Sequence, residues 1–582
     1  MTRTVVSSSQ FVTSDSITNG DVEIVLAGGV SIDPQITNGG LVIVSSGGSV
    51  TGARLRLSTA MDTAPARMIV HSGGVVENTN VSDGAALIVS AGETLGTTVS
   101  GFHAFPGGPT RRSTEHVLSG GTARGTTIES SGALIVSAGG VADGVTVVAG
   151  GHLVTGGGKF DGRVASVTNL LVSGRGAIAN LQSTTVASGC VVADGGTIKA
   201  GNFPFASIIT DTTVSSGGRF VLSRDCTASN TAVLSGGIQI LEEGFEYGVT
   251  VAAGGRIIAD PLARLIGATI SSGGSAVLKE LSFASAVDVL SGGRLTLDNS
   301  NAEDLVIAPG ATVIVKDAQL QGLHSMSAGG LIVGSAGVVF VSSGISTTGG
   351  IVRSGGDIVV MSGGRAADLT VLSGGEIEYA GGSVEGLAIR AGATAIVESM
   401  ATVSSFHNSG VNLLVSSGGT VSNANVQSAA LIVSAGGRAS GVRVQNGALT
   451  LESGGTISGA TLQSSYEIIS SGGRALGTTT FARSSTLEFQ AKTGILVTAS
   501  GFDPSDAIDL AAFRFAGSQL SVVSRKATTQ ITVTNHLQRA SIVLFGQYSA
   551  AGFHLARNGT GSTVSYIPPA DAIHGLAPDH KH

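Results

Sequence analysis

The sequence has no tryptophan and few other aromatic residues, which excludes a core built from large rings. Aromatic residues make up 4% of the 582 positions and charged residues 12%, whereas hydrophobic residues make up 42%. The interior must therefore be aliphatic, and a hydrophobic content this high excludes a disordered glycine-rich tract. The chain has only two cysteines, Cys190 and Cys226, which excludes a disulfide framework.

Charge and long apolar runs are also scarce. The formal net charge is −7 and no basic tract with interleaved aromatic residues is present, so we expect no nucleic-acid partner. Glycine and serine interrupt every apolar run before it reaches about 18 residues, so we expect no transmembrane segment. The first residues, MTRTVVSSSQFVTSDS, hold no apolar run of the roughly 7–15 residues that a secretory signal needs. We therefore expect the protein either to stay in the cytoplasm or to be exported by a signal elsewhere in the chain.

Glycine, in contrast, is abundant, with 88 residues, many of them in SGG or AGG turns at regular spacing. The first glycines of successive turns stand at 217, 236, 254, 273 and 292, and again at 418, 436, 454 and 472. Between 355 and 392, alternating short and long gaps divide the same unit in two. The turn glycines that define it are Gly217, Gly236, Gly254, Gly273, Gly292, Gly355, Gly363, Gly374, Gly381, Gly392, Gly418, Gly436, Gly454 and Gly472. A period near 20 predicts stacked structural repeats.

One unit shows how the repeat is expected to fold. Residues 133–137 (ALIVS) read as a short buried strand, and the glycine pair that follows is expected to supply positive φ for a sharp turn. An antiparallel meander would also use Gly-Gly turns, but its strand lengths drift and its sheets curl or split after about ten strands. We therefore predict an all-β fold, a parallel β-solenoid with 18–19-residue coils, with Val, Ile, Leu and Ala inside and Ser, Thr, Asp and Arg facing water. About 25 such coils would make a rod on the order of 120 Å long.

The repeat does not cover the chain uniformly. We expect an N-terminal cap at 1–20, the solenoid at 21–495, a small C-terminal β domain at 496–567 and a flexible tail at 568–582. Interruptions at 101–115 and 196–206 carry Phe and Pro and are predicted to be extruded loops, where recognition is expected. The C-terminal domain is predicted to have an aromatic core drawn from Phe502, Phe513, Phe515, Phe545, Tyr548, Phe553 and Tyr566.

The cysteine spacing gives a sharper expectation. Cys190 and Cys226 are separated by two of the shorter repeat units, which in a strict stack places them in one column two layers apart. Their separation would then be roughly 9.6 Å, beyond the ~7 Å that a disulfide can bridge. We expect two free thiols.

The unit LIVSAGGVADGVTVVAGG, together with GGTISGATLQSS and SGGRALGTTT, resembles the AIDA-type repeat of autotransporter adhesin passengers over most of residues 20–490. The resemblance implies a surface-exposed β-solenoid used in adhesion, autoaggregation and biofilm formation, with Ser and Thr open to O-heptosylation. The sequence departs from that family in showing neither its N-terminal signal nor its C-terminal membrane domain.

The segments SGFDPSDAIDL (500–510) and IVLFGQYSAAGFHLARNGTGSTVSY (542–566) look like the C-terminal module of type I secreted repeat proteins. That likeness implies an uncleaved C-terminal export signal and contact with secretion machinery. The calcium-binding nonapeptide of RTX proteins is absent from the sequence, so calcium-driven folding is not supported.

Catalytic chemistry has little support in the sequence. Enzymes on a parallel β-helix gather two or three carboxylates with Lys or Arg on one face. Here neither of the two densest carboxylate groups, at 242–246 and 298–304, is expected to recur one coil away with a matching basic residue. We interpret the carboxylates and histidines as solvated or turn residues and expect no catalytic residue, cofactor or metal. The groups considered are Asp298, Glu303 and Asp304; Glu242, Glu243 and Glu246; Asp503, Asp506 and Asp509; His71, His116, His152, His324 and His407; and His574, His580 and His582.

These observations lead to one prediction and two alternatives. We predict a non-enzymatic secreted β-solenoid, extracellular or on a bacterial cell surface, that acts as an adhesin or as a structural protein of the matrix or biofilm. Its expected partners are cell-surface glycans or other copies of itself. The first alternative is a cytoplasmic filament assembled by end-to-end stacking of solenoids whose terminal coils are unsealed. A polysaccharide-active enzyme is the lowest-ranked alternative.

Overall fold

The computed structural model shows an all-β parallel solenoid of about 24 turns with a coil spacing of about 19 residues, as predicted. It describes residues 2–57, 64–103, 110–156, 163–182, 184–201, 206–308, 310–316, 318–321, 325–326, 331–334, 336–491, 495–536 and 538–569. The only helical element in those ranges is a 3-10 turn at Ala550–Gly552. The chain forms two compact units, Met1–Val313 and Ile314–His582, and each is described by itself.

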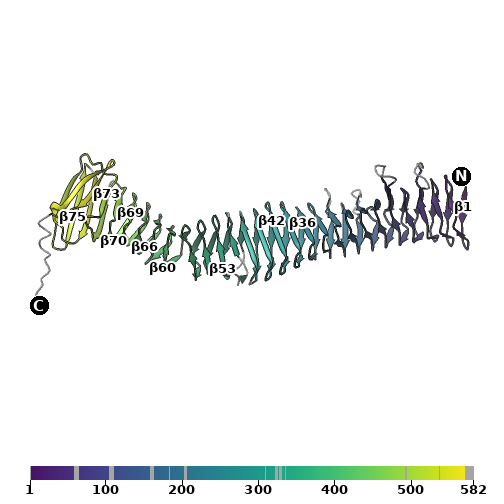
Figure 1. Cartoon of the computed structure of the whole chain (residues 1–582), viewed down its shortest axis with the longest axis horizontal. Coiled ribbons are helices and arrows are strands. Elements are labelled where there is room, and N and C mark those ends of the chain that lie inside the picture. The colour runs from purple at the N-terminus through teal and green to yellow at the C-terminus, as the bar shows by residue number, and fades with distance from the viewer. Residues whose placement is uncertain are drawn as a thin grey trace. The chain divides into compact units, whose positions relative to one another are not determined.

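A coil of the first unit contains three short strands. One coil consists of β4 (Val22–Val25), β5 (Val30–Ile32) and β6 (Gln35–Thr37), and the next begins at β7 (Leu41–Val44). Each strand pairs in parallel with its equivalent one coil later, so that Val22 lies opposite Leu41. We call the three resulting sheets faces A, B and C, after β4, β5 and β6, and the junctions between them corners. Figure 1 shows these strands stacked side by side along each unit.

The coils of the first unit keep the spacing that the glycines predict. On face A, β36 (Ile238–Glu242), β39 (Arg256–Asp260), β42 (Ser275–Lys279) and β45 (Arg294–Asp298) pair in sequence. Their first residues, 238, 256, 275 and 294, advance in the same steps as the turn glycines. Within each strand alternate side chains point inward, as Ile257 and Ala259 do in β39, and the interior of the coil is therefore mainly aliphatic.

The two glycines of a corner pair have different roles. Gly236 has φ +73° and its N–H donates to the carbonyl of Gly254 in the next coil at 3.0 Å. Gly237 is not at positive φ, contrary to the expectation for both members of the pair. Instead, a Cβ added to Gly237 would lie 2.3 Å from the carbonyl oxygen of Val214 in the preceding coil, a distance that real Cβ atoms essentially never show. The first glycine is needed for its backbone angle and the second for its missing side chain.

All of the turn glycines named from the sequence have positive φ, between +73° and +93°. A second left-handed position recurs at the corner between faces B and C, at Asn230 (φ +57°), Gly248 (φ +69°) and Gly267 (φ +65°). There the N–H again donates forward, as Asn230 does to the carbonyl of Tyr247 at 3.0 Å. Glycine, asparagine and aspartate tolerate this conformation best, which explains their recurrence at this corner.

Both predicted interruptions are shorter than expected, because parts of them belong to strands. Within 196–206, residues Thr197–Ala200 form β30 on face A, and the coil that follows is longer than the regular ones, since Thr197 lies opposite Arg219. Within 101–115, β16 (Phe102–His103) pairs antiparallel with β17 (Thr110–Arg111), and β18 (Ser113–Val117) is back on face A. Residues 104–109 and 202–205 lie outside the described residues.

The expectation that the cysteines share a column is wrong. Cys190 immediately precedes β29 (Val191–Ala193) on face C, whereas Cys226 immediately precedes β34 (Thr227–Ser229) on face B. The longer coil between Thr197 and Arg219 adds residues that a strict count of equal coils does not allow for. Both thiols are free, as predicted, and the structure places both in the buried interior.

Several coils of the second unit contain two strands instead of three, one of which is longer than the strands of the first unit. The coils of the second unit include β53 (Ser346–Val352) and β55 (Arg365–Val371), which pair in parallel so that Ser346 lies opposite Arg365. Further along, β65 (Ala430–Val433) and the longer β66 (Arg438–Gln445) make up one coil, and Ala430 lies opposite Ala448 of the next.

Parallel stacking in the second unit continues to β72 (Ile495–Ser500) and β73 (Ala507–Leu510), where antiparallel strands follow. β74 (Gln519–Ser524), β75 (Thr528–Asn535) and β76 (Gln538–Phe545) form one antiparallel set, and β76 runs parallel to β72. β77 (Phe553–Asn558) and β78 (Gly561–Tyr566) form another beside β73. The last parallel coil is thereby covered by antiparallel strands.

An aromatic core lies under these antiparallel strands, but it does not begin at residue 496. Phe502 contacts Phe481 edge to face with ring centroids 5.3 Å apart, and Phe553 contacts Tyr566 at 4.8 Å. Phe481 belongs to the long strand β70 (Arg474–Arg483), so one hydrophobic cluster spans the last coils and the antiparallel strands. Of the predicted core residues, Phe515 and Phe545 are exposed.

Candidate functional site

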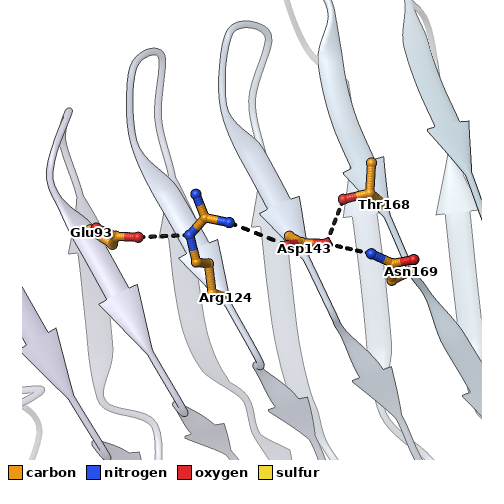
Figure 2. A network of polar contacts seen from close by, with 5 residues as sticks. All are labelled: Glu93, Arg124, Asp143, Thr168 and Asn169. Carbon is orange, nitrogen blue, oxygen red and sulfur yellow. Dashed lines mark hydrogen bonds and ion pairs between the residues drawn. The ribbon is translucent and has the colours of Figure 1, made fainter.

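The outer faces of the solenoid carry columns of polar side chains, and one column on face B is a continuous network (Figure 2). Arg124 lies between two carboxylates, with Nε 2.7 Å from Glu93 Oε1 and Nη1 3.2 Å from Asp143 Oδ2. Asp143 Oδ1 also accepts hydrogen bonds from Thr168 Oγ1 at 2.6 Å and from Asn169 Nδ2 at 2.9 Å. The network therefore links four successive coils.

The electrostatics of this network are those of a structural clamp. The hydrogen bond to Glu93 raises the pKa of Arg124, and hydrogen bonds from Thr168 and Asn169 lower the pKa of Asp143. Both shifts favour the charged forms, so neither Arg124 nor Asp143 is prepared to give or take a proton near neutral pH. Since the arginine is half exposed, solvent screens the ion pairs and their effect on stability is small.

The structure does not bring the predicted carboxylate groups together as sites. Asp298 lies on face A in β45, Glu303 on face B in β46 (Asn301–Glu303), and Asp304 at the corner after it, with φ +55°. Three neighbours in sequence thus point away from the coil on different sides. Glu243 forms an ion pair with Arg224 at 2.5 Å.

Glu246 is buried, so its interpretation as a solvated residue is wrong. It occupies the inward position of β37 (Phe245–Tyr247), and the side-chain amide of Gln239 donates to its Oε2. Burial raises the pKa of Glu246 to about 7. Its inward orientation follows from the alternation within the strand, because Phe245 and Tyr247 on either side face outward.

Three more glutamates share this buried setting, namely Glu23, Glu115 and Glu467. Glu115 accepts hydrogen bonds from Thr94 at 2.6 Å and from Thr126 at 2.9 Å, whereas one oxygen of Glu467 has no partner. Burial raises the pKa of each of them, and that of Glu467 reaches about 7. Sequence reasoning missed all of them, although a strand such as Val22–Val25, VEIV, already places its glutamate on the same side as the inward Val25.

The C-terminal aspartates hold a turn, and Asp506 is buried where a surface residue was predicted. The backbone N–H groups of Ser485 and Asp503 each donate to Asp506 at 2.8 Å. Asp509 accepts from Asn558 Nδ2 at 2.9 Å. Across the described residues no three or more His, Cys, Asp or Glu side chains are placed to hold a metal ion.

The predicted histidines that lie within the described residues form no cluster. His116 and His152 face outward on β18 and β24 (His152–Thr155), and partial burial lowers the pKa of both. His407 Nδ1 lies 2.6 Å from the carbonyl of Ser405. His324 and the tail residues His574, His580 and His582 lie outside the described residues.

Comparison with known proteins finds weak structural matches. No protein-family model matches the chain, and no curated protein matches its sequence. Among solved structures, a TibA fragment hyper-glycosylated by TibC aligns at 25% identity over 53% of this chain and 94% of that one, with a TM-score of 0.39. The tailspike protein of Escherichia coli bacteriophage HK620, in complex with a pentasaccharide, aligns at 10% identity over 94% of this chain and 84% of that one, with a TM-score of 0.12. Scores this low carry no argument about function.

No helix among the described residues has both the length and the apolar character needed to span a bilayer.

Proposed function

We propose that this protein is a non-enzymatic β-solenoid of the bacterial surface or extracellular matrix that acts in adhesion. The observation that carries the proposal is the regular column structure of the outer faces, which aligns polar side chains of neighbouring coils in rows. Such a surface suits many weak, equivalent contacts with a repetitive partner rather than one reaction at one site. The resemblance of the repeat to adhesin passengers supports the same role.

Serine columns at the corners are one such repeated feature. In the first unit the residue before the turn glycine is an exposed serine in most neighbouring coils: Ser216, Ser235, Ser272 and Ser291. In the intervening coil the position is Ala253. The hydroxyls form a row along the corner at roughly the spacing of parallel strands, about 4.8 Å per coil. We propose this row as acceptor positions for glycans, as the repeat resemblance implies, and mass spectrometry of protein from its native host tests it.

Localisation is the decisive experiment. The full chain and a version ending at residue 495 are expressed in the host, and culture supernatant, cell surface and cytoplasm are probed by immunoblot. The proposal expects the full chain outside the cell and the shortened chain retained inside. A full-length protein confined to the cytoplasm of intact cells would contradict the surface role.

End-to-end stacking into a filament has less support. It needs an exposed parallel coil at each joining end, and in the second unit the last parallel strands are already followed by antiparallel ones. Negative-stain microscopy tests it directly, since single particles of uniform length would contradict a filament.

A further inference from the structure

Face A of the first unit carries a regularly spaced row of arginines between residues 219 and 298. Arg219, Arg256 and Arg294 occupy the same outward column, separated by Ile238 and Ser275. All three arginines are exposed. In the part of the chain that the structure describes, Arg256 and Arg294 form no ion pair, so their guanidinium groups are available to a partner.

A row of mostly acidic residues runs parallel to the arginines on the same face. It lies four residues further along each strand and contains Glu242, Asp260, Lys279 and Asp298 in successive coils. Lys279 lies 3.8 Å from Asp260, so the row keeps a net negative charge. At ~3.3 Å per residue the two rows are about 13 Å apart.

Between the two charged rows lies a row of outward β-branched side chains. It consists of the outward positions Ile240, Ile258, Val277 and Thr296 on the strands β36, β39, β42 and β45, two of which are labelled in Figure 1. Ile258, Val277 and Thr296 are partly exposed, whereas Ile240 is buried. The face is therefore basic along one margin, apolar or hydroxyl-bearing in the middle and acidic along the other margin. Residues 219–298 are all described, and the coils in this range are 18 or 19 residues long, so no inserted loop interrupts the face.

We propose that this face binds the same face of a second copy, with the two solenoids parallel and their coils in register. A two-fold axis along the solenoid reverses the strand direction across the interface, so the basic margin of one copy meets the acidic margin of the other. Arg256 then faces Asp260 of the second copy, and Arg294 faces its Asp298, each pair occurring twice. An antiparallel dimer would instead place arginine against arginine.

The order of charges along the two rows also favours this pairing. The two coils with arginine in the basic row have aspartate in the acidic row, and the coil with Lys279 has the uncharged Ser275. In-register pairing therefore places no like charges opposite one another in β39, β42 and β45. The β-branched row would lie on the axis and meet its own equivalent at the ~10 Å separation of packed sheets.

The size of the face sets the expected strength. Five coils at ~4.8 Å and five residues at ~3.3 Å give an area on the order of 400 Å² per copy. Stable interfaces bury about 800 Å² per partner, so the pairing is weak in solution and becomes strong when many copies are arrayed side by side. The biological meaning of the inference rests on the proposed surface role, but the pairing itself is measured on the purified protein wherever that protein resides.

Sedimentation of the purified full chain at 10 µM to 1 mM, at low and high salt, tests the pairing. We expect a concentration-dependent dimer that salt weakens, and an R256E/R294E variant whose dissociation constant rises at least about tenfold. A D260R/D298R variant should behave likewise, and an equimolar mixture of the two variants should recover dimers. In the mixed dimer every pair again joins opposite charges, with the native sign along one margin and the exchanged sign along the other. Failure of the mixture to recover dimers would overturn the proposal, as would a monomer at all concentrations. Capture of an anionic polysaccharide by that monomer would assign the arginine row to a polyanion.

Cross-linking decides the direction of the pairing. Parallel in-register copies place Ile258 opposite Ile258 and Thr296 opposite Thr296 at the ~10 Å separation of packed sheets, beyond the reach of a disulfide. A bis-maleimide cross-linker that spans this separation should therefore link Ile258→Cys to itself and Thr296→Cys to itself. Ser285→Cys on face B is the matched control and should stay monomeric, and the native thiols are buried. Linkage only between the two different variants would show antiparallel pairing and refute the register. Neither experiment depends on where the protein is located in the cell. A negative result in either would therefore refute the pairing without refuting the proposed function.

Discussion

The two glycines of a corner pair have different roles, so Gly236→Ala and Gly237→Ala should lower the stability of the protein by different amounts. At Gly236 alanine must adopt φ +73°, and the nearest atom to its Cβ is the flexible hydroxyl of Ser216 at 3.0 Å. A left-handed alanine costs about 1–2 kcal/mol, partly offset by the lower entropy of the unfolded chain. We expect a net loss of about 1 kcal/mol.

At Gly237 alanine has no φ penalty, but its Cβ would lie 2.3 Å from the carbonyl oxygen of Val214. To reach an ordinary contact of at least 3.4 Å, the two coils must separate locally by about 1.1 Å or more. The same carbonyl accepts the N–H of Leu234 at 2.8 Å, and this bond is disturbed by the shift. A buried hydrogen bond left unmade costs about 1–3 kcal/mol, and the contact strain adds a similar amount. The expected total is about 3–5 kcal/mol.

Urea unfolding and amide hydrogen exchange of the two variants measure the difference. Gly237→Ala should lower protection in its own coil and in the preceding one, since both must move apart, whereas Gly236→Ala should act mainly at the turn. Ser235→Ala, at an exposed position of the same turn, is the control and should change little. Equal losses for both glycines would refute the claim that backbone contact selects the second one.

Three further predictions concern buried groups. The folded-state pKa of Glu467, about 7, lies above the ordinary value of 4.5, so the stability it contributes is full below pH 4.5 and is lost as pH rises through 7. The loss approaches about 3 kcal/mol. Glu467→Gln should therefore reduce the pH dependence of urea unfolding, whereas Glu488→Gln, on the outward side of β71 (Thr486–Phe489), should leave it unchanged. Phe513→Ala, at a fully buried position of the aromatic core, should cost about 3–5 kcal/mol by thermal or urea unfolding, and a cost below 1 kcal/mol would mean that the core is not packed as described. Burial raises the pKa of the Cys190 thiol to about 12, so iodoacetamide at pH 8 should label it only after denaturation; rapid labelling of the native protein would contradict its burial.

The fold could be predicted from the sequence because the turn glycines recur once per coil, so that their spacing equals the number of residues in a coil. Parallel pairing followed from the constancy of that spacing, and the register on face A reproduces it at Arg256, Ser275 and Arg294. The position of the cysteines was predicted wrongly because a count of residues cannot tell a regular coil from the longer one between Thr197 and Arg219.

The polar features were harder to predict because they depend on which side of a strand a residue faces. Glu246 reads as one of three neighbouring acidic residues in the sequence, yet a shift of one position separates an exposed glutamate from a buried one. The network around Arg124 joins residues 19 to 31 positions apart, and only the coil register brings them together. The paired basic and acidic rows of face A are likewise visible only once strands are aligned.

Extra residues enter this scaffold at its corners and leave the faces in register. Leu41 still lies opposite Arg67 although the coil between them is longer than the regular ones, and Thr197 lies opposite Arg219. Differences in the length of these junctions therefore leave the hydrogen-bonded pairing of the faces unchanged. A foreign epitope or binding peptide spliced between Ala200 and Ile208 would be displayed without disturbing the layers above and below it.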